Sequence, residues 1–371
     1  MTPKGSRGKT QMQVSKLVIG AAAAGAVVLA VFAGSMFSAG DSAPDDTPVL
    51  FQWQDYVDAP FLSEYRTAFG DEPQTAIYAD EDEAFAKMRA GYKPDVMGPC
   101  AYEFPRWQEA GLIQPIDTGR LKNWAKIAPA LRALPDIEAG DGRVWFVPHY
   151  WGNTSVTFRT DLAPEYVGRE SWEILFDPKY KGRVAVLEGV DDTIPFVAHM
   201  IGVDAYAMSD DDWQKVQMKL RELIGQVRFV SSDNTSLAQG LASGELVAAM
   251  SWRVVYATLR KEGVQVAYMN PPGGIFTYVC GLVVNKDAKN YDKALALIDS
   301  SLSDEAAHYT FAEIGDGPAN VEALAKEPDE LFAQLGIDRD VDTFLKSGLF
   351  QRRLKNKDEI VNAWTEIRAG R

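Results

Sequence analysis

The chain has 371 residues, of which 46% are hydrophobic and 24% charged, and its formal net charge at pH 7 is −14. A strongly acidic protein is unsuited to binding nucleic acid or anionic lipid, because both ligands are themselves negatively charged. An acidic surface is compatible with a cationic solute, although solubility is the simpler explanation for it. The length exceeds the usual size of a single hydrophobic core, so we expect two lobes.

The first 40 residues predict an export signal or a membrane anchor. Four basic residues precede an uncharged stretch that runs from Leu17 to Gly40. A basic start, an apolar stretch and small residues at 38–40 are typical of a secretory signal. The length of the apolar stretch also suits an uncleaved anchor. In both cases the positive end stays inside and the remaining body, with 34 basic and 52 acidic side chains, is exported.

Strands and helices alternate in the first part of the body. The pattern predicts strands at 48–53, 74–78 and 94–98, and helices at 61–69, 81–90 and about 102–110. Strand–helix–strand order with short connections indicates crossover units and a mostly parallel sheet. Ligands of such sheets bind at the carboxyl ends of the strands, which here lie near residues 53–56 and 99–102.

The second part of the body predicts another α/β lobe and a return crossing. Two strands are expected on either side of Trp151-Gly152-Asn153, and a helix is expected after the cap region Ser209–Asp212. Further strands are expected at 144–150, 155–159, 183–187, 246–252, 264–268 and 276–284. A helical turn is expected at 172–176, and helices are expected at 213–223, from the residues after Asn234 to Ala242, within 291–315 and at 358–368.

No motif in the chain predicts catalysis. The three histidines, His149, His199 and His308, lack the spacing of zinc ligands. Nucleophile-elbow, phosphate-loop and dinucleotide-binding glycine motifs are absent from the sequence. Adjacent Asp191 and Asp192 could in principle serve a hydrolase, but adjacent acids in a loop are more often simply solvated. We therefore predict no catalytic residue, no metal site and no cofactor.

Cys100 and Cys280 are the only cysteines in the chain. An exported protein reaches a compartment in which disulfides persist. Sequence alone does not tell whether these two residues lie within bonding distance, so the disulfide stays an open question.

Several short segments, taken in order, carry a resemblance to a known family. They are Phe51-Gln52-Trp53-Gln54-Asp55-Tyr56-Val57, Pro94-Asp95-Val96 through Tyr102, Ala110-Gly111-Leu112-Ile113-Gln114-Pro115-Ile116-Asp117, Val147-Pro148-His149-Tyr150-Trp151-Gly152-Asn153-Thr154, Ser171-Trp172 with Pro178 and Tyr180-Lys181-Gly182, Ser232-Asp233-Asn234, Gly273-Gly274-Ile275-Phe276 and Ala363-Trp364-Thr365-Glu366-Ile367-Arg368-Ala369-Gly370. With these segments, residues 48–370 resemble the spermidine/putrescine-binding proteins of polyamine ABC importers.

The resemblance implies an α/β, type II-like periplasmic-binding-protein fold with mixed, mostly parallel sheets. Two lobes joined by crossing strands would close on a ligand cleft like a hinge. The first lobe would comprise residues 41–151 and 279–325, and the second would comprise 152–278 and 326–371. The implied function is a periplasmic solute-binding protein, not an enzyme, whose partner is an ABC permease of the inner membrane. Contact with the membrane would be made only through the N-terminal segment, which would tether the protein if it is not cleaved.

The resemblance also implies a set of ligand-binding residues. Aromatic rings stack on alkyl chains and attract ammonium groups, and carboxylates anchor amines. Glu188 or Asp191 is an alternative to Asp192 as the anchor, and Ser232 is alternatively a helix cap. The implied residues are Trp53, Tyr56, Tyr102, Asp192, Ser232, Trp252 and Gln351.

Departures from the family pattern leave the solute open. Val255 and Val279 stand where polyamine binders place amine-anchoring aspartates, and loss of both anchors without replacement would weaken diamine binding. Asp316 is a candidate for a relocated carboxylate. Arg253 would repel an ammonium group if it faced the cleft, and would instead hold the carboxylate of a zwitterion. Alternatively, Arg253 points to solvent, and Asp316 with Asp192 suffices for an amine.

Three functions remain after this comparison. The first is binding of a polyamine such as putrescine or spermidine. The second is binding of a zwitterionic amino compound such as an ω-amino acid. The third is a membrane-tethered sensor domain that signals rather than transports, which an uncleaved anchor would favour.

Overall fold

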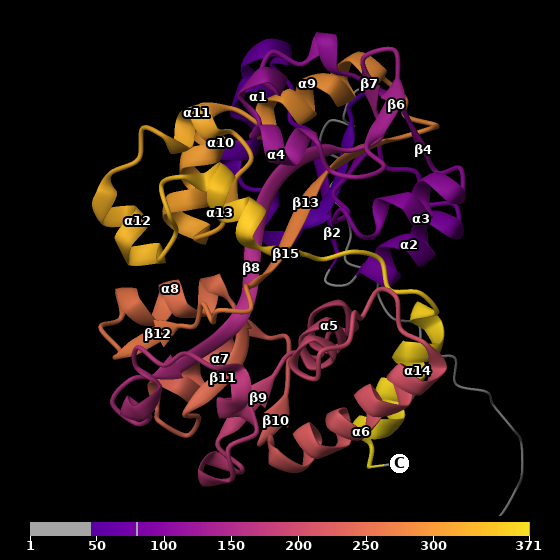
Figure 1. The fold of residues 1–371 in the computed structure, drawn as a ribbon. Coiled ribbons are helices and arrows are strands. Elements are labelled where there is room, and N and C mark those ends of the chain that lie inside the picture. Colours follow the sequence, from indigo (N-terminus) through magenta and orange to yellow (C-terminus); the bar gives the residue numbers. More distant parts are fainter. Residues whose placement is uncertain (1–45, 79–80, 371) are drawn as a thin grey trace, which may run out of the picture. The chain divides into compact units, whose positions relative to one another are not determined.

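The computed structural model describes residues 46–78 and 81–370 (Figure 1). The segment at 1–40 that predicts a signal or an anchor lies outside these residues. Within the described ranges, no helix combines the length and the apolar character needed to cross a membrane.

A mixed twelve-stranded sheet forms the framework of the protein. Its strand order is β10-β9-β11-β8-β13-β3-β1-β2, with β12 and β14 paired to β8 and with β4 and β15 paired to β13. The strands are β1 Val49–Trp53, β2 Gln74–Tyr78, β3 Val96–Met97, β4 Ile113–Gln114, β8 Val147–Arg159, β9 Val184–Val186, β10 Phe229–Val230, β11 Ala248–Trp252, β12 Val266–Tyr268, β13 Phe276–Asn285, β14 Gly317–Pro318 and β15 Leu349–Phe350. A separate small sheet contains β5 Ile116–Asp117, β6 Glu138–Gly140 and β7 Arg143–Val144.

Parallel pairing dominates at both ends of the main sheet. On one side β1 pairs in parallel with β2 and β3, and on the other side β9 pairs in parallel with β10 and β11. The long strands β8 and β13 pair antiparallel with each other between these two groups (Figure 1). The predicted α/β fold class is confirmed.

The crossing strand β8 corrects one prediction. The sequence suggested two strands separated by Trp151-Gly152-Asn153, but residues Val147–Arg159 form one continuous strand. Gly152 does not interrupt it, because its backbone is paired with Tyr278 on β13. A Cβ atom on Gly152 would lie only 2.1 Å from the Tyr278 hydroxyl and 2.6 Å from an Asp316 carboxylate oxygen. The glycine is therefore required for the close approach of these side chains.

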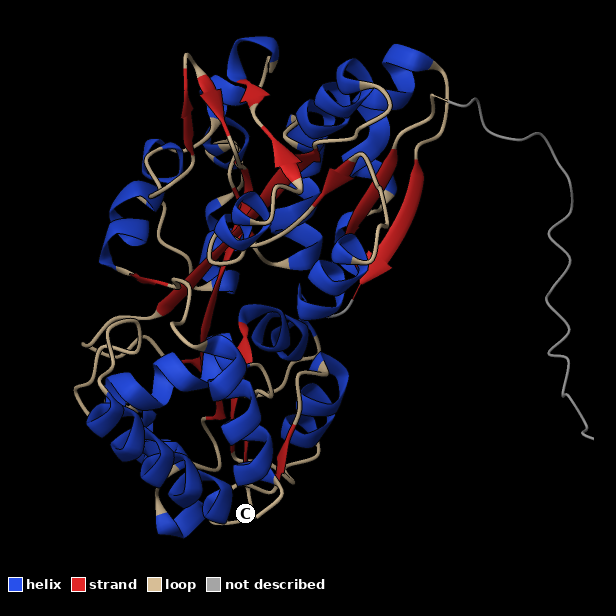
Figure 2. Ribbon diagram, turned by 90° about the vertical axis from the view of Figure 1, so that its right-hand side faces the viewer, coloured by secondary structure: helices blue, strands red, loops and turns tan. Residues whose placement is uncertain are grey.

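Helices cover both faces of the strands (Figure 2). They are α1 Ala59–Phe69, α2 Glu81–Arg89, α3 Phe104–Glu109, α4 Pro129–Arg132, α5 Val190–Met200, α6 Asp210–Gln226, α7 Asn234–Ala242, α8 Arg253–Lys261, α9 Tyr291–Ser301, α10 Asp304–Tyr309, α11 Val321–Leu324, α12 Asp329–Leu335, α13 Val341–Ser347 and α14 Lys357–Arg368.

The start of α5 corrects the expectation that Asp191 and Asp192 lie in a loop. Both residues lie in the first turn of this helix, and Asp192 is buried. Carboxylates are favourable there because the helix N-terminus carries a partial positive charge. The helix presents Asp192 toward the interior, where Thr154 of β8 donates a hydrogen bond to it.

Two hydrophobic cores are built around the sheet. The first packs α1, α3 and α9 against β1, β3 and parts of β8 and β13, and the second packs α5, α6, α7 and α14 against β9 and β11. Phe332, Leu335 and Val341 belong to the first core, whereas the boundary implied by the family resemblance assigns residues 326–371 to the second lobe. Helix α14 packs in the second core through Ile360, Trp364 and Ile367.

A disulfide between Cys100 and Cys280 crosses the first core. The two residues face each other as an antiparallel bridge between the loop after β3 and the strand β13. This pairing answers the question that the sequence left open.

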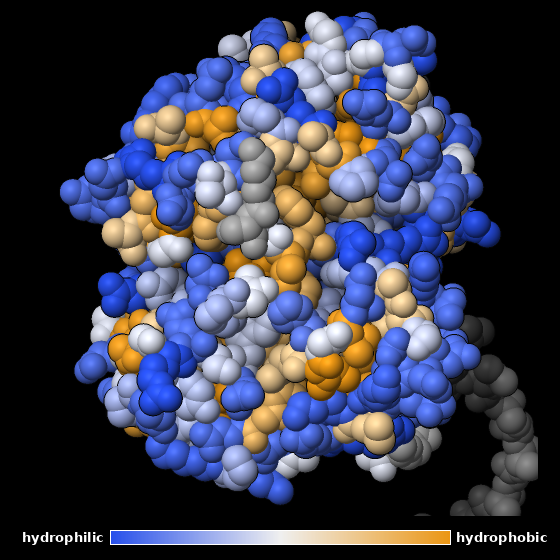
Figure 3. All heavy atoms as spheres, in the orientation of Figure 1, coloured by the Kyte–Doolittle hydropathy of each residue, from blue (hydrophilic) through white to orange (hydrophobic). Residues whose placement is uncertain are grey.

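On the face of the molecule in Figure 3, hydrophobic side chains gather near the middle of the view, and hydrophilic side chains dominate above and below them.

Candidate ligand-binding pocket

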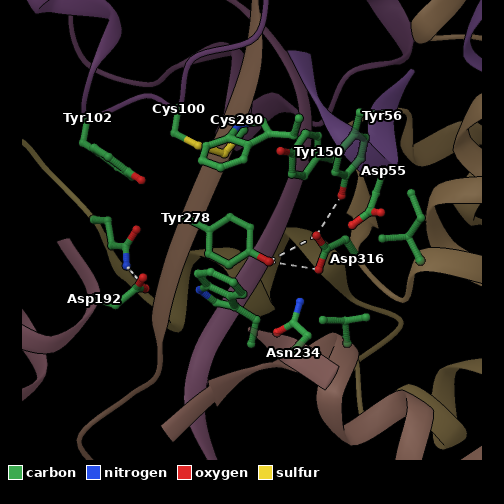
Figure 4. A pocket seen from close by; sticks show the side chains of 15 residues that line it. Asp55, Tyr56, Cys100, Tyr102, Tyr150, Asp192, Asn234, Tyr278, Cys280 and Asp316 are labelled. Atoms are coloured by element: carbon green, nitrogen blue, oxygen red, sulfur yellow. Dashed lines mark hydrogen bonds between the residues drawn. A yellow bond between two sulfur atoms is a disulfide. The ribbon is translucent and has the colours of Figure 1, made fainter. Parts of the chain in front are cut away.

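A pocket with an empty volume of about 690 Å³, including its open mouth, is lined by residues of both cores. Several of them follow the carboxyl ends of strands, where ligands of α/β proteins bind. The lining residues are Trp53, Asp55, Tyr56, Cys100, Tyr102, Tyr150, Asp192, Asn234, Trp252, Val254, Tyr278, Cys280, Ile314, Asp316 and Gln351 (Figure 4).

Asp192 forms one end of the pocket. Its Oδ1 accepts hydrogen bonds from Thr154 Oγ1 at 2.6 Å and from Gln351 Nε2 at 2.8 Å. Gln351 is fixed in turn, because its backbone N–H donates to the carbonyl of Thr277 on β13. Burial raises the pKa of Asp192, and the donated hydrogen bonds oppose that increase.

Asp316 forms the other end of the pocket. It follows Gly315, whose φ of 90° suits glycine, and directly precedes β14, which pairs with β8. Tyr56 donates a hydrogen bond to Asp316 Oδ2 at 2.8 Å, and the Tyr278 hydroxyl lies 3.1 Å from both carboxylate oxygens. Burial raises the pKa of Asp316 to about 6, and the two hydroxyl donors oppose the increase. The carboxyl group thus stays buried and ready to accept a cation.

The two ends are separated by aromatic walls. Figure 4 shows Asp192 on one side of the pocket and Asp316 with Asp55 on the other, with the ring of Tyr278 between them. Tyr56 and Tyr150 stack with ring centroids 3.7 Å apart and planes inclined by 7°. The lining residues include no Lys, Arg or His. This arrangement suits an elongated molecule with a positive charge at each end and an apolar middle.

The raised pKa of Asp316 predicts pH-dependent cation binding. Below about pH 6 the carboxyl group is protonated and neutral, and above it the ionised form attracts an ammonium group. We expect the affinity for an ammonium ligand to be about ten-fold weaker near pH 5 than near pH 7.5, since a cation binds the ionised form preferentially. Calorimetric titration at the two pH values measures this ratio. The Asp316→Asn variant should show a smaller dependence, with the remainder arising from Asp192, whose pKa burial also raises. A wild-type affinity that rises on acidification would contradict the assignment.

Seven of the nine sequence-predicted site residues lie around this single pocket. They are Trp53, Tyr56, Tyr102, Asp192, Trp252, Asp316 and Gln351. Ser232 is not among the lining residues. Its hydroxyl accepts a hydrogen bond from the backbone N–H of Glu188, and the helix cap is provided by Asp233 instead. The predicted role of each lining residue in ligand binding stays a prediction.

Arg253 is placed differently from both sequence-based alternatives. It is 2% exposed and does not line the pocket, so it neither faces the ligand nor points to solvent. Its guanidinium donates to the carbonyl of Leu335 at 2.6 Å and to Asn153 Oδ1 at 2.8 Å, and it lies over the ring of Tyr268. Arg253 therefore has a structural role, because its hydrogen bonds connect the start of α8 to the end of α12.

Replacing Arg253 with methionine is expected to lower the free energy of unfolding by about 3 kcal/mol. The change leaves the buried oxygens of Leu335 and Asn153 without their charged donor. Denaturant unfolding measures the loss. Exposed Arg352, whose partner is Asp204, provides the matched control, and Arg352→Met should cost less than about 1 kcal/mol. Equal losses in the two variants would contradict the role given to Arg253.

The structure adds lining residues that the sequence did not reveal. Three of these residues lie within or beside the segments that resemble the family, namely Asp55, Tyr150 and Tyr278. No local sequence pattern showed that their side chains face the pocket. Asn234 starts α7, and its Oδ1 is buried without a hydrogen-bond partner among the described residues. Val254 lines the pocket, whereas the neighbouring Val255 belongs to the second core.

Val279 is the other valine that stands where polyamine binders place an amine-anchoring aspartate, and it packs in the first core.

The described residues contain no group of three or more His, Cys, Asp or Glu side chains able to hold a metal ion.

Sequence comparison connects the chain to proteins that bind solutes outside the cytoplasm. Residues 72–334 match the model of the family described as bacterial extracellular solute-binding protein. The spermidine/putrescine-binding periplasmic protein of Escherichia coli K12 is 25% identical over 355 residues, which cover 94% of this chain and 97% of that protein.

Solved structures share the fold. A putative spermidine/putrescine ABC transporter protein from Listeria monocytogenes aligns with a TM-score of 0.75 and 20% identity, covering 88% of this chain and 100% of the other. The Atu4243–GABA receptor aligns with a TM-score of 0.68 and 20% identity, covering 88% and 98%. Membership in a family of binding proteins agrees with the prediction that the chain is not an enzyme. The chain belongs to the family of bacterial extracellular solute-binding proteins.

Proposed function

We propose that the protein binds a linear polyamine such as putrescine or spermidine in the pocket between Asp192 and Asp316. The observation that carries the proposal is the presence of a buried carboxylate at each end of an aromatic-lined pocket. Each carboxylate would anchor one ammonium group, and the rings between them would pack on the methylene chain. The relative from Escherichia coli is named for the same two solutes.

Asp316 replaces the anchors that are missing at the valine positions. In this proposal Tyr56 and Tyr278 hold its carboxylate toward the ligand, and Asp55 adds negative charge at the same end. Asn234 contributes an acceptor, since its buried Oδ1 has no partner within the described chain. A turn of this amide into the pocket would let the oxygen accept a hydrogen bond from an amine and thereby recover the free energy lost through its desolvation.

The proposal includes the biological setting of the binding event. The protein would be exported by its N-terminal segment and would deliver the solute to an ABC permease in the inner membrane. The two cores would behave as two lobes that close on the ligand, with β8 and β13 as the connection between them. The relative's periplasmic name supports this location.

A zwitterionic ω-amino acid is a less suitable ligand. GABA appears in the name of one structural neighbour, but the side chain considered for its carboxylate, Arg253, is occupied by Leu335 and Asn153. A carboxylate placed in the pocket would meet Asp192 or Asp316 without a cationic partner among the lining residues.

Calorimetric titration against putrescine, spermidine, an ω-amino acid and a neutral sugar tests the proposal. We expect micromolar or tighter binding of the diamine and triamine, and no heat from the sugar. Tighter binding of the ω-amino acid than of putrescine would contradict the polyamine assignment. An absence of binding by all four compounds would contradict the proposed solute class.

A further inference from the structure

A buried charge cluster lies beside the Asp192 end of the pocket. Its centre is Lys357, whose ammonium group lies 2.5 Å from Glu103 Oε1 and 2.8 Å from Asp191 Oδ2. The side chains of Lys357, Glu103 and Asp191 are 11%, 1% and 16% exposed. Asp82 lies 3.8 Å from the same ammonium group, and the buried Glu81, which interacts electrostatically with Glu103 and Lys357, accepts a hydrogen bond from the backbone N–H of Cys100.

The cluster joins elements of both cores. Glu103 directly precedes α3 of the first core, whereas Asp191 lies on α5 and Lys357 on α14, which pack in the second. Each carboxylate partner is adjacent in sequence to a pocket residue, because Glu103 follows Tyr102 and Asp191 precedes Asp192. The ammonium group also lies 6.0 Å from the centroid of the Tyr102 ring.

The position of Lys357 is not explained by the helix that carries it. Lys357 is the first residue of α14, where the partial positive charge of a helix terminus disfavours a cation. The preceding residue, Asn356, has a φ of 55°, a left-handed conformation that asparagine adopts more readily than most other non-glycine residues. Despite this unfavourable position at the helix terminus, the ammonium group lies between the buried carboxylate of Glu103 and the partly buried carboxylate of Asp191.

We propose that Lys357 is a positioning residue for ligand binding. Its pair with Glu103 positions the neighbouring Tyr102, and its pair with Asp191 positions the neighbouring Asp192. Lys357 thereby connects the first core to the second next to the bound amine. This inference rests on the proposed function. The contacts of the cluster exist only when the two cores are close together, as in the ligand-bound protein. Loss of the cluster should therefore affect the dissociation rate of the ligand more than its association rate.

The predicted signature is a faster dissociation rate with a nearly unchanged association rate. Truncating one partner of a buried charge pair acts mainly on dissociation, so Lys357→Met should accelerate putrescine release about ten-fold. Lys357→Arg keeps the charge and should stay closer to wild type. Arg353→Met is the matched control, because Arg353 joins the same C-terminal segment to α3 through an exposed pair with Glu109; it should leave both rates unchanged.

Stopped-flow tryptophan fluorescence of the purified protein measures both rates, and ligand-free thermal unfolding verifies that each variant is folded. Should Lys357→Met fail to fold, Glu103→Gln provides the test, since it removes one arm of the cluster and keeps the pair with Asp191. We expect Glu103→Gln to accelerate release as well. Wild-type dissociation rates in these variants, with binding intact in the parent protein, would overturn the role of Lys357. Failure of the parent protein to bind any amine would instead overturn the proposed function.

Discussion

Replacing Asp316 with asparagine is expected to weaken putrescine binding by about 3 kcal/mol, or about 100-fold. The amide retains the shape of the side chain and can still accept hydrogen bonds from Tyr56 and Tyr278, but it lacks the charge that anchors an ammonium group. Asp192→Asn should give a loss of similar size at the opposite end. Calorimetric titration at about pH 7.5 measures both losses.

Stability should change in the opposite direction. Burial raises the pKa of Asp316 to about 6, which means that the folded protein pays for keeping this carboxyl group ionised above that pH. A neutral amide removes the penalty, so ligand-free Asp316→Asn should unfold at a higher temperature than wild type near pH 7.5. Asp287→Asn, which alters a partly exposed carboxylate paired with Lys286, is the matched control and should change neither property appreciably. Unaltered putrescine affinity in Asp316→Asn would contradict its role as an anchor.

The disulfide carries the second large predicted effect. Replacing both Cys100 and Cys280 with alanine should lower the free energy of unfolding by about 3–5 kcal/mol. The bond links positions 180 residues apart, so its loss frees a long loop in the unfolded chain. Guanidinium unfolding without reductant measures the effect, and the same measurement on wild type with reductant should give a comparable loss.

Ligand affinity should change much less than stability in this double variant. Backbone hydrogen bonds from Ala101 to Val279 and from Gly281 to Pro99 hold the same loop against β13 without the sulfur atoms. We therefore expect less than about a three-fold change in putrescine affinity. A double variant with wild-type stability would show that the disulfide does not constrain the fold, and a large loss of affinity would show that the backbone pairing does not suffice to hold the pocket wall.

Much of the architecture was predictable from the sequence because local patterns and tertiary packing agree. The structure places the strand at 74–78 and the helix that follows it at nearly the predicted bounds. Where the two disagree, tertiary pairing prevails. Gly152 is a break signal in the sequence, yet it lies in the middle of β8 because Tyr278 and Asp316 need the space of its missing side chain.

The candidate site was predictable where residues follow the ends of strands. Trp53 terminates β1, and this position already directs attention to it, whereas Trp252 at the end of β11 was implied by the family resemblance. The sequence named Asp316 as a candidate carboxylate, but its partners required the fold, because the pairing of β14 with β8 brings it to Tyr56 across 260 positions of the sequence. Arg253 shows the converse case. Its neighbour Trp252 lines the pocket, but the side chain of Arg253 turns into the protein to reach Leu335.

A crystal structure of the protein with putrescine tests the central claim most directly. We predict one terminal nitrogen within hydrogen-bond distance of Asp192, the other within reach of Asp316, and the carbon chain against the ring of Tyr278. Putrescine bound at another place, or bound here with its nitrogens remote from both carboxylates, would contradict the mode of recognition described above.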